Sequence, residues 1–150
     1  PFIIETGTLN HAACNGVSAA IDFIASLGEG KTYKEKLIDA YNNLGKHEFM
    51  LASHLYSELN KLNKITVIGT DFSSLKRTPT VSFVHNEFTA TQICQKLAQK
   101  NICAWDGHFY ALKAIQSLGL EERGGVTRLG ISAYNSLDEI NRTVEAISKI

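Results

Sequence analysis

The spacing of apolar positions changes near residue 64. Before it, apolar side chains recur every three or four residues over 11–27 and 33–62, which predicts two amphipathic helices. The second helix would be roughly 45 Å long at 1.5 Å per residue, long enough to link two parts of a larger molecule. After residue 64 the apolar runs are short and are separated by polar or glycine-containing segments. They predict strands over 65–69, 81–85, 102–105 and 126–132 and helices over 89–98, 110–118 and 136–147.

This order of elements predicts an α+β fold. The expected architecture is a small mixed or antiparallel sheet of about four strands with helices on one face, preceded by two helices of which one is long. Helix ends support the assignment, because Asn10 is a suitable N-cap for the first helix. Ser136, followed three residues later by Glu139, has the spacing of a capping box for the last helix.

The segment 28–32 reads Gly-Glu-Gly-Lys-Thr and resembles part of a phosphate-binding loop. That motif needs an additional glycine five residues before the second one, where this chain has Ala25, and it must follow a strand. Here it follows a predicted helix. A turn between two helices is therefore the preferred interpretation.

Composition excludes several classes of function. The 150 residues contain 15 Lys and Arg against 15 Asp and Glu, so no excess of positive charge favours nucleic acid or an anionic membrane surface. No apolar run reaches the ~18 residues of a membrane span. Three cysteines, an odd number, predict free thiols in a reducing, cytoplasmic compartment. Cys103 lies in a predicted strand, where a buried and inert thiol is expected.

Arg128 stands inside the apolar run Val-Thr-Arg-Leu-Gly-Ile. A buried arginine needs an anionic partner, and its planar fork suits a carboxylate held by two hydrogen bonds. A structural ion pair and a strand-edge arginine that points to water are the alternatives. The preceding loop 105–110 is polar, contains glycine and carries His108, which is the usual setting for substrate contact. None of the five histidines has the spacing of a metal site, so no metal is expected.

Two segments resemble one known family. Residues 124–140 contain Arg-x-x-x-x-x-Tyr-Asn-Ser-x-Asp-Glu-Ile, and residues 4–10 read Ile-Glu-Thr-Gly-Thr-Leu-Asn. Both are similar to signatures of the class V aminotransferases and cysteine desulfurases, which belong to the pyridoxal-phosphate enzymes of fold type I. The resemblance implies that Arg128 binds the α-carboxylate of an amino-acid substrate near Trp105 and Gly107. It also implies that Gly7 and Thr8 contact the cofactor phosphate of a neighbouring subunit.

The resemblance also identifies two departures. Desulfurases carry their reactive cysteine in a Gly-His-His-Cys-Ala loop, whereas residues 107–111 read Gly-His-Phe-Tyr-Ala, with Tyr110 in the cysteine position. A desulfurase-like subgroup without the usual catalytic cysteine is therefore implied, with Asp106, His108 and Tyr110 as candidate catalytic residues. The lysine that forms the Schiff base with pyridoxal phosphate lies in a Ser/His-x-His-Lys segment in this family, and no lysine of this chain has that context.

These features predict a C-terminal fragment of a pyridoxal-phosphate-dependent enzyme. The expected division is a tail of the large cofactor-binding domain over 1–30, a linking helix over 31–63 and a small α+β domain over 64–150. The expected partners are the enzyme's own large N-terminal domain, a second subunit in a homodimer, and an amino acid. The parent enzyme would be a transferase or lyase, and the fragment alone would be inactive. The alternative is a non-catalytic α+β module for binding or dimerisation.

Overall fold

The computed structural model describes residue 4, residues 7–73 and residues 77–150. Glu5 and Thr6 of the predicted signature, and residues 74–76 between the first two predicted strands, lie outside the described residues. The chain divides into two compact units, Pro1–Lys46 and His47–Ile150. The long helix α2 (Tyr33–Leu59) takes part in both units. The predicted division at residues 30 and 63 stays a prediction.

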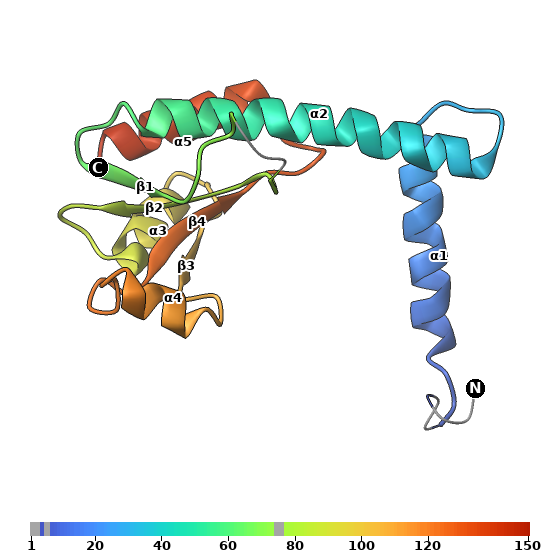
Figure 1. The fold of residues 1–150 in the computed structure, drawn as a ribbon, viewed down its shortest axis with the longest axis horizontal. Coiled ribbons are helices and arrows are strands. Elements are labelled where there is room, and N and C mark those ends of the chain that lie inside the picture. The colour runs from blue at the N-terminus through green and yellow to red at the C-terminus, as the bar shows by residue number, and fades with distance from the viewer. Residues whose placement is uncertain (1–3, 5–6, 74–76) are drawn as a thin grey trace. The chain divides into compact units, whose positions relative to one another are not determined.

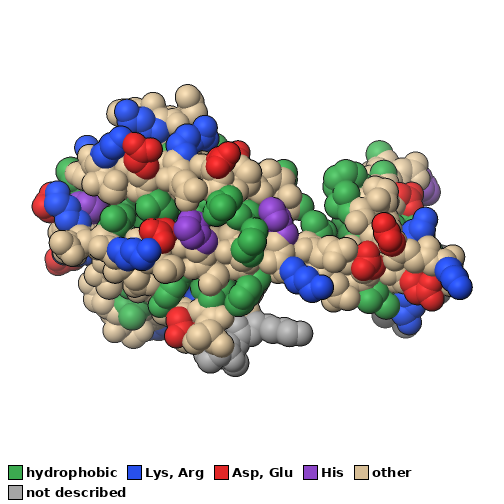
Figure 2. All heavy atoms as spheres, turned by 90° about the horizontal axis from the view of Figure 1, so that it is seen from above, with side chains coloured by type: hydrophobic (Ala, Val, Ile, Leu, Met, Phe, Trp, Pro, Cys, Tyr) green, Lys and Arg blue, Asp and Glu red, His purple; other side chains and the backbone are tan. Residues whose placement is uncertain are grey.

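The first unit is a pair of helices with a very small core. Helix α1 (His11–Ser26) begins after Asn10, whose Oδ1 accepts the backbone N–H of Ala13 at 3.0 Å, as predicted. Among the described residues of this unit, Ala25 and Ala40 are the two that are buried. Most apolar side chains of α1 remain at the surface, and green patches mark such side chains in Figure 2. The helical pattern of apolar residues therefore correctly predicted α1, but these residues cover no core within the unit.

The segment 28–32 is the turn between α1 and α2. A Cβ atom on Gly28 would lie 2.0 Å from the carbonyl oxygen of Lys36, so only glycine allows this close approach. The backbone N–H groups of Lys31 and Thr32 donate to Oε2 of Glu35 at 2.8 and 3.0 Å, and these bonds lower the pKa of Glu35. Because these N–H groups already have a carboxylate partner, the inter-helix turn is confirmed in preference to a phosphate loop.

The second unit is built on one antiparallel sheet of four strands in the order β1-β2-β4-β3. The strands are β1 (Ile65–Ile68), β2 (Thr80–His85), β3 (Trp105–Gly107) and β4 (Val126–Gly130). Helices α3 (Ala90–Ala98), α4 (Leu112–Ser117) and α5 (Leu137–Ser148) follow β2, β3 and β4 in turn (Figure 1). The predicted α+β class, with a four-stranded antiparallel sheet after two leading helices, is confirmed. The expectation of helices on one face is wrong for α4, which packs on the opposite face from α3 and α5.

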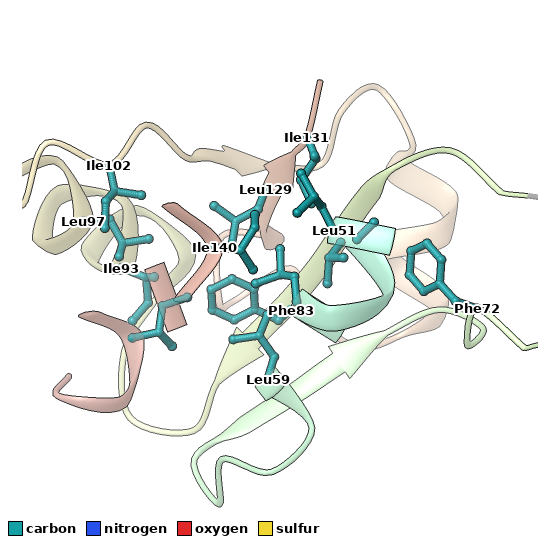
Figure 3. Close-up of a cluster of buried hydrophobic side chains, with 14 residues drawn as sticks. Leu51, Leu59, Phe72, Phe83, Ile93, Leu97, Ile102, Leu129, Ile131 and Ile140 are labelled. Atoms are coloured by element: carbon teal, nitrogen blue, oxygen red, sulfur yellow. The ribbon is translucent and has the colours of Figure 1, made fainter. Parts of the chain in front are cut away.

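The main core of this unit lies on one face of the sheet. Strand alternation directs Val81, Phe83 and Leu129 to this face, where the C-terminal half of α2, α3 and α5 cover them (Figure 3). Phe83 is completely buried. Helix α5 is closed by the predicted capping box, since Ser136 Oγ accepts the N–H of Glu139 and the Glu139 carboxylate accepts the N–H of Ser136. Because the main core lies on one face of the sheet, side chains of β4 that point to the other face are not part of this core.

The opposite face of the sheet holds a smaller apolar cluster. Ile115 of α4, Leu120 and Val126 are buried together, with Val84 and Phe109 packed against them. The cluster fixes the segment that runs from β3 through α4 to the start of β4. It therefore supports the loop in which the sequence placed most of the candidate site residues.

Several boundaries differ from the prediction. The long helix α2 ends at Leu59 and not at residue 62, and three further differences lie near β3 and β4. The third strand is Trp105–Gly107 and not 102–105, because only residues 105–107 pair with β4. Helix α4 begins at Leu112 and not at residue 110, because Phe109 and Tyr110 have positive φ angles of 50° and 61°, outside the helical region. Strand β4 ends at Gly130, since Ile131 bonds to Pro79 beyond the ladder. Among the described residues, none of the helices combines the length and apolar character of a membrane span.

Candidate functional site

Arg128 lies at the centre of β4, opposite Ser82 of β2 and Trp105 of β3. Its neighbours Thr127 and Leu129 are buried, and Leu129 belongs to the main core, so alternation directs Arg128 to the opposite face. The side chain is half-buried. Its guanidinium carbon lies 3.9 Å from the centre of the Phe109 ring. Within the part of the chain that the structure describes, no carboxylate lies close enough to form an ion pair with Arg128.

The loop after β3 surrounds this arginine. Gly107, Phe109 and Tyr110 all have positive φ angles, of 125°, 50° and 61°. The turn is closed by the Ala111 N–H, which donates to the His108 carbonyl at 2.7 Å. The Tyr110 N–H donates to Nδ1 of His108 at 3.1 Å, which requires Nδ1 to be unprotonated. Phe109 thereby points toward Arg128, whereas Tyr110 is 99% exposed.

Residues 105–110 and Arg128 line a pocket of about 460 Å³. A second hollow of about 390 Å³ shares Trp105 and Arg128 with it and is also lined by Cys103. The structure therefore brings together six predicted site residues around this pocket, namely Trp105, Asp106, Gly107, His108, Tyr110 and Arg128. The sequence did not predict that Phe109 contacts Arg128, because the fold brings these two residues together from distant positions.

The prediction of a buried thiol at Cys103 is wrong. Cys103 is exposed, because the ladder begins two residues later and the preceding residue, Ile102, takes the position in the core. Cys94 of α3 is the half-buried thiol. Burial, followed by the charge of Asp106, raises the pKa of Cys94 to about 11. The two thiols therefore have opposite accessibilities.

The carboxylate of Asp106 does not face Arg128. Its register partner is the buried Thr127, and its Oδ2 accepts a hydrogen bond from the Thr91 hydroxyl of α3 at 2.5 Å. Asp106 thus ties β3 to α3 on the core side of the sheet, while Trp105 and Arg128 lie on the other side. The hydrogen bond to Thr91 is a structural contact, and it does not test the predicted catalytic role of Asp106.

A close approach of two glycines fixes the base of the site loop. Gly125, immediately before β4, is buried with a φ of 85°, and a Cβ atom there would lie 2.2 Å from the carbonyl oxygen of Gly107. Gly107 is the last residue of β3, so the loop begins at the point of contact. The Gly-Gly pair at 124–125 is visible in the sequence, but its contact with Gly107 could not be predicted from it.

The remaining predicted residues lie elsewhere. Gly7 and Thr8 are exposed residues of the first unit, in the bend before α1, and the arginine pocket belongs to the second unit. His47 and His54, both on α2, contact later segments of the same chain. Nε2 of His47 donates to the Asn135 carbonyl at 2.9 Å, and Nε2 of His54 lies 2.8 Å from Oδ1 of Asn141. The described residues contain no cluster of three or more His, Cys, Asp or Glu side chains suited to a metal ion.

Comparison with known proteins places these features in a family. The chain is 26% identical over 151 aligned residues to a probable cysteine desulfurase of Methanothermobacter thermautotrophicus, covering all of this chain and 34% of that protein. It is 28% identical over 149 residues to a probable cysteine desulfurase of Pseudomonas putida, covering 99% of this chain and 32% of that protein. The chain thus spans about one third of the length of these relatives, a share that matches their C-terminal region.

Solved structures show the same fold. The crystal structure of the cysteine desulfurase CsdA of Escherichia coli superimposes with a TM-score of 0.75 at 20% identity, over 99% of this chain and 32% of that one. An apo cysteine desulfurase of Thermococcus onnurineus superimposes with a TM-score of 0.68 over 78% of this chain. The model of the family described as aminotransferase class-V matches residues 1–143. The chain therefore belongs to the class V aminotransferase family, whose cysteine desulfurase-like members it resembles, and this family depends on pyridoxal phosphate.

Proposed function

We propose that the chain forms the C-terminal part of a pyridoxal-phosphate-dependent, cysteine desulfurase-like enzyme, in which Arg128 binds the carboxylate of an amino-acid substrate. The observation that carries the proposal is the environment of Arg128. The guanidinium is half-buried in a pocket, stacks on Phe109, and has no carboxylate partner among the described residues. A partly desolvated arginine without an internal anion is suited to an anion that arrives from solution.

A structural ion pair would have been the simplest alternative for this residue. The three ion pairs of the described residues join lysines to glutamates and lie away from β4. An arginine in a buried structural pair would also be directed to the core, whereas Arg128 lies on the face opposite the main core. The geometry is therefore that of a binding residue, with the N–H edge of the guanidinium available to a planar carboxylate.

The residues of this chain fit part of a pyridoxal-phosphate site. Gly7 and Thr8 are exposed just before α1, and the first turn of that helix contains no acidic residue that would repel a phosphate. We propose that they contact the phosphate across a dimer. Pyridoxal phosphate, held as a Schiff base on a lysine, would supply an electron sink for the reaction of an amino-acid substrate. Since no lysine here stands in the required motif, we propose that the large domain of the complete protein supplies it.

The sequence of loop 107–111 argues against the persulfide reaction of the cysteine desulfurases. Tyr110 stands where desulfurases have their cysteine, and a phenol cannot accept the sulfur atom of a substrate as a thiolate does. We therefore propose a desulfurase-like subgroup that lacks this cysteine and uses the loop for binding and proton transfer. His108, whose Nδ1 accepts the Tyr110 N–H, presents Nε2 as the atom that can exchange a proton.

The apolar surface of the first unit supports the proposed partners. Val17 and Phe23 of α1 are 59% and 64% exposed, and Tyr41 of α2 is 60% exposed. Several large apolar side chains at the surface of so small a unit indicate a surface that another part of the assembly covers. We propose that the large domain and a second subunit cover it. The same surface is what a non-catalytic dimerisation module would have, and that function remains the second candidate.

Substitution of Arg128 in the complete protein tests the proposal. Arg128→Ala should weaken binding of an amino-acid substrate by on the order of 2–5 kcal/mol, because it leaves a desolvated carboxylate without a partner. Arg128→Lys keeps the charge but loses the planar fork, so it should also impair binding. Thermal stability and the cofactor absorption spectrum should change little. Arg142→Ala, an exposed arginine of α5, is the matched control.

Two results would contradict the proposal. One is a loss of thermal stability in Arg128→Ala with normal substrate affinity in the folded enzyme, which is the behaviour of a structural arginine. The other is a complete protein that carries no lysine reactive toward pyridoxal phosphate. The second result, tested by borohydride reduction and mass spectrometry, would favour the non-catalytic module.

A further inference from the structure

We propose that Phe109 is a positioning residue that holds the guanidinium of Arg128, so that the N–H edge of Arg128 meets a carboxylate lying in the guanidinium plane. This inference rests on the proposed function, because it assigns to Phe109 a part in the same carboxylate site. It commits the site to an anion that binds with two oxygens, and it names a residue that the family signatures do not identify.

The contact between the two side chains is close. The guanidinium carbon of Arg128 lies 3.9 Å from the centre of the Phe109 ring, which is the distance of a direct cation–π contact. No hydrogen bond or ion pair to another described residue holds the Arg128 side chain. The ring of Phe109 is therefore the described contact best suited to fix the orientation of the guanidinium.

Phe109 is itself held from two sides. Its ring packs against the small cluster formed by Ile115, Leu120 and Val126, on the sheet face that carries Arg128. Its backbone has a φ of 50°, and the next residue, Tyr110, has a φ of 61°. Two consecutive non-glycine residues in this region are strained, and such strain persists only where the surroundings enforce it. The result of this conformation is that Phe109 faces the arginine while Tyr110 projects into solvent.

The stacking determines which ligand fits. A guanidinium presents its N–H donors in its own plane, and a ring over one face leaves those donors free at the edge. A ligand that binds at the edge with two parallel hydrogen bonds must present two oxygens side by side, as the carboxylate of an amino acid does. Phe109 also removes rotamer freedom from Arg128 before the ligand arrives, which increases affinity through pre-organisation.

Ligand binding to the complete protein tests the inference. The probes are L-alanine, which has a carboxylate, and L-alaninamide, which lacks it, with affinities measured by calorimetry. Phe109→Leu keeps an apolar side chain on the cluster but removes the ring, and it should weaken L-alanine binding about 3- to 30-fold, the range expected for loss of a cation–π contact. Binding of L-alaninamide should change much less. Phe109→Tyr should restore the affinity for L-alanine.

A matched control is available in the same unit. Lys96 lies 4.5 Å above the ring of Phe88, a cation–π contact outside the pocket. Phe88→Leu removes the same ring from a similar contact and should leave both affinities unchanged. If Phe109→Leu lowers the melting temperature strongly, 3,4,5-trifluorophenylalanine at position 109 keeps the shape of the ring while weakening its negative face. It should reduce L-alanine affinity in the same direction.

A spectroscopic measurement tests the stacking without any ligand. Protons of the Arg128 guanidinium should resonate upfield of their usual position because of the ring current of Phe109, and this shift should disappear in Phe109→Leu. Unchanged Arg128 resonances, or an L-alanine affinity that Phe109→Leu and the fluorinated residue leave intact, would overturn the inference but not the carboxylate site. Failure of the unsubstituted protein to bind L-alanine would overturn the carboxylate site and the inference together.

Discussion

Gly125→Ala should destabilise the second unit by about 2–5 kcal/mol. A Cβ atom at this position would lie 2.2 Å from the carbonyl oxygen and 2.4 Å from the carbonyl carbon of Gly107. Both are backbone atoms, so no side-chain rotation relieves the overlap, and β3 must separate from β4. Overpacking of this kind costs about 1–3 kcal/mol. The φ of 85° adds the cost of a left-handed conformation, about 1–2 kcal/mol for a residue with a Cβ atom.

Urea denaturation followed by circular dichroism measures this difference. Gly119→Ala is the matched control, because Gly119 has a φ of 66° but its Cβ atom would meet nothing within 4 Å. It should lose only the conformational part, about 1–2 kcal/mol. Gly45→Ala, in the middle of α2 with open space around it, should gain about 1 kcal/mol. If Gly125→Ala costs no more than Gly119→Ala, the close approach of Gly125 to Gly107 does not exist in solution.

Three further results are expected. Iodoacetamide at pH 8 should alkylate the exposed Cys103 in the native protein and spare Cys94, because the pKa of Cys94 is raised to about 11, chiefly by burial. Equal labelling of the two cysteines, measured by mass spectrometry, would contradict their different burial. Burial lowers the pKa of His85, so the unfolded chain binds a proton near pH 6.5 while the folded chain does not, and stability should fall as pH drops below about 6.5. The loss between pH 7 and 5 in urea titrations should be smaller in His85→Gln, and an equal loss would count against the burial of this ring. Ser136→Ala should cost about 1 kcal/mol by removing the cap of α5, and an unchanged melting temperature would show that the cap contributes nothing.

The helices could be predicted from the sequence because their apolar periodicity and the capping residues at their ends are both local features. Asn10 and Ser136 bond to backbone groups within three residues of themselves, so the information is contained in the adjacent sequence. The first helix was expected over 11–27 and the structure has His11–Ser26. The same holds for the turn 28–32, where Glu35 and Thr32 bond to one another.

The third strand could not be placed from its own residues. The apolar run at 102–105 has the composition of a strand, but pairing with β4 selects Trp105–Gly107. That register depends on Gly125 approaching Gly107, a contact between residues far apart in the sequence. Composition therefore identified a strand in this region, and the partner strand decided which residues form it.

The candidate site was predicted in part for the same reason. An arginine inside an apolar strand is conspicuous in a sequence, so Arg128 could be selected, as could the glycine-containing loop before it. The contact of Arg128 with Phe109 depends on the left-handed conformations of Phe109 and Tyr110 and on the cluster around Ile115. No local sequence pattern predicts either feature. Asp106 was selected for its chemistry, and only the sheet shows that its carboxylate bonds to Thr91 on the other face.

The short strand β3 has a consequence for how this sequence can diverge. Its alternation sends Trp105 to the pocket and Asp106 to α3, so loss or gain of one residue between Cys103 and Gly107 would exchange the two. A carboxylate would then stand beside Arg128 and neutralise it from within the protein. Homologues that keep the arginine should therefore conserve the length of this segment, while insertions accumulate in the exposed turns, and its length becomes a marker for recognising them.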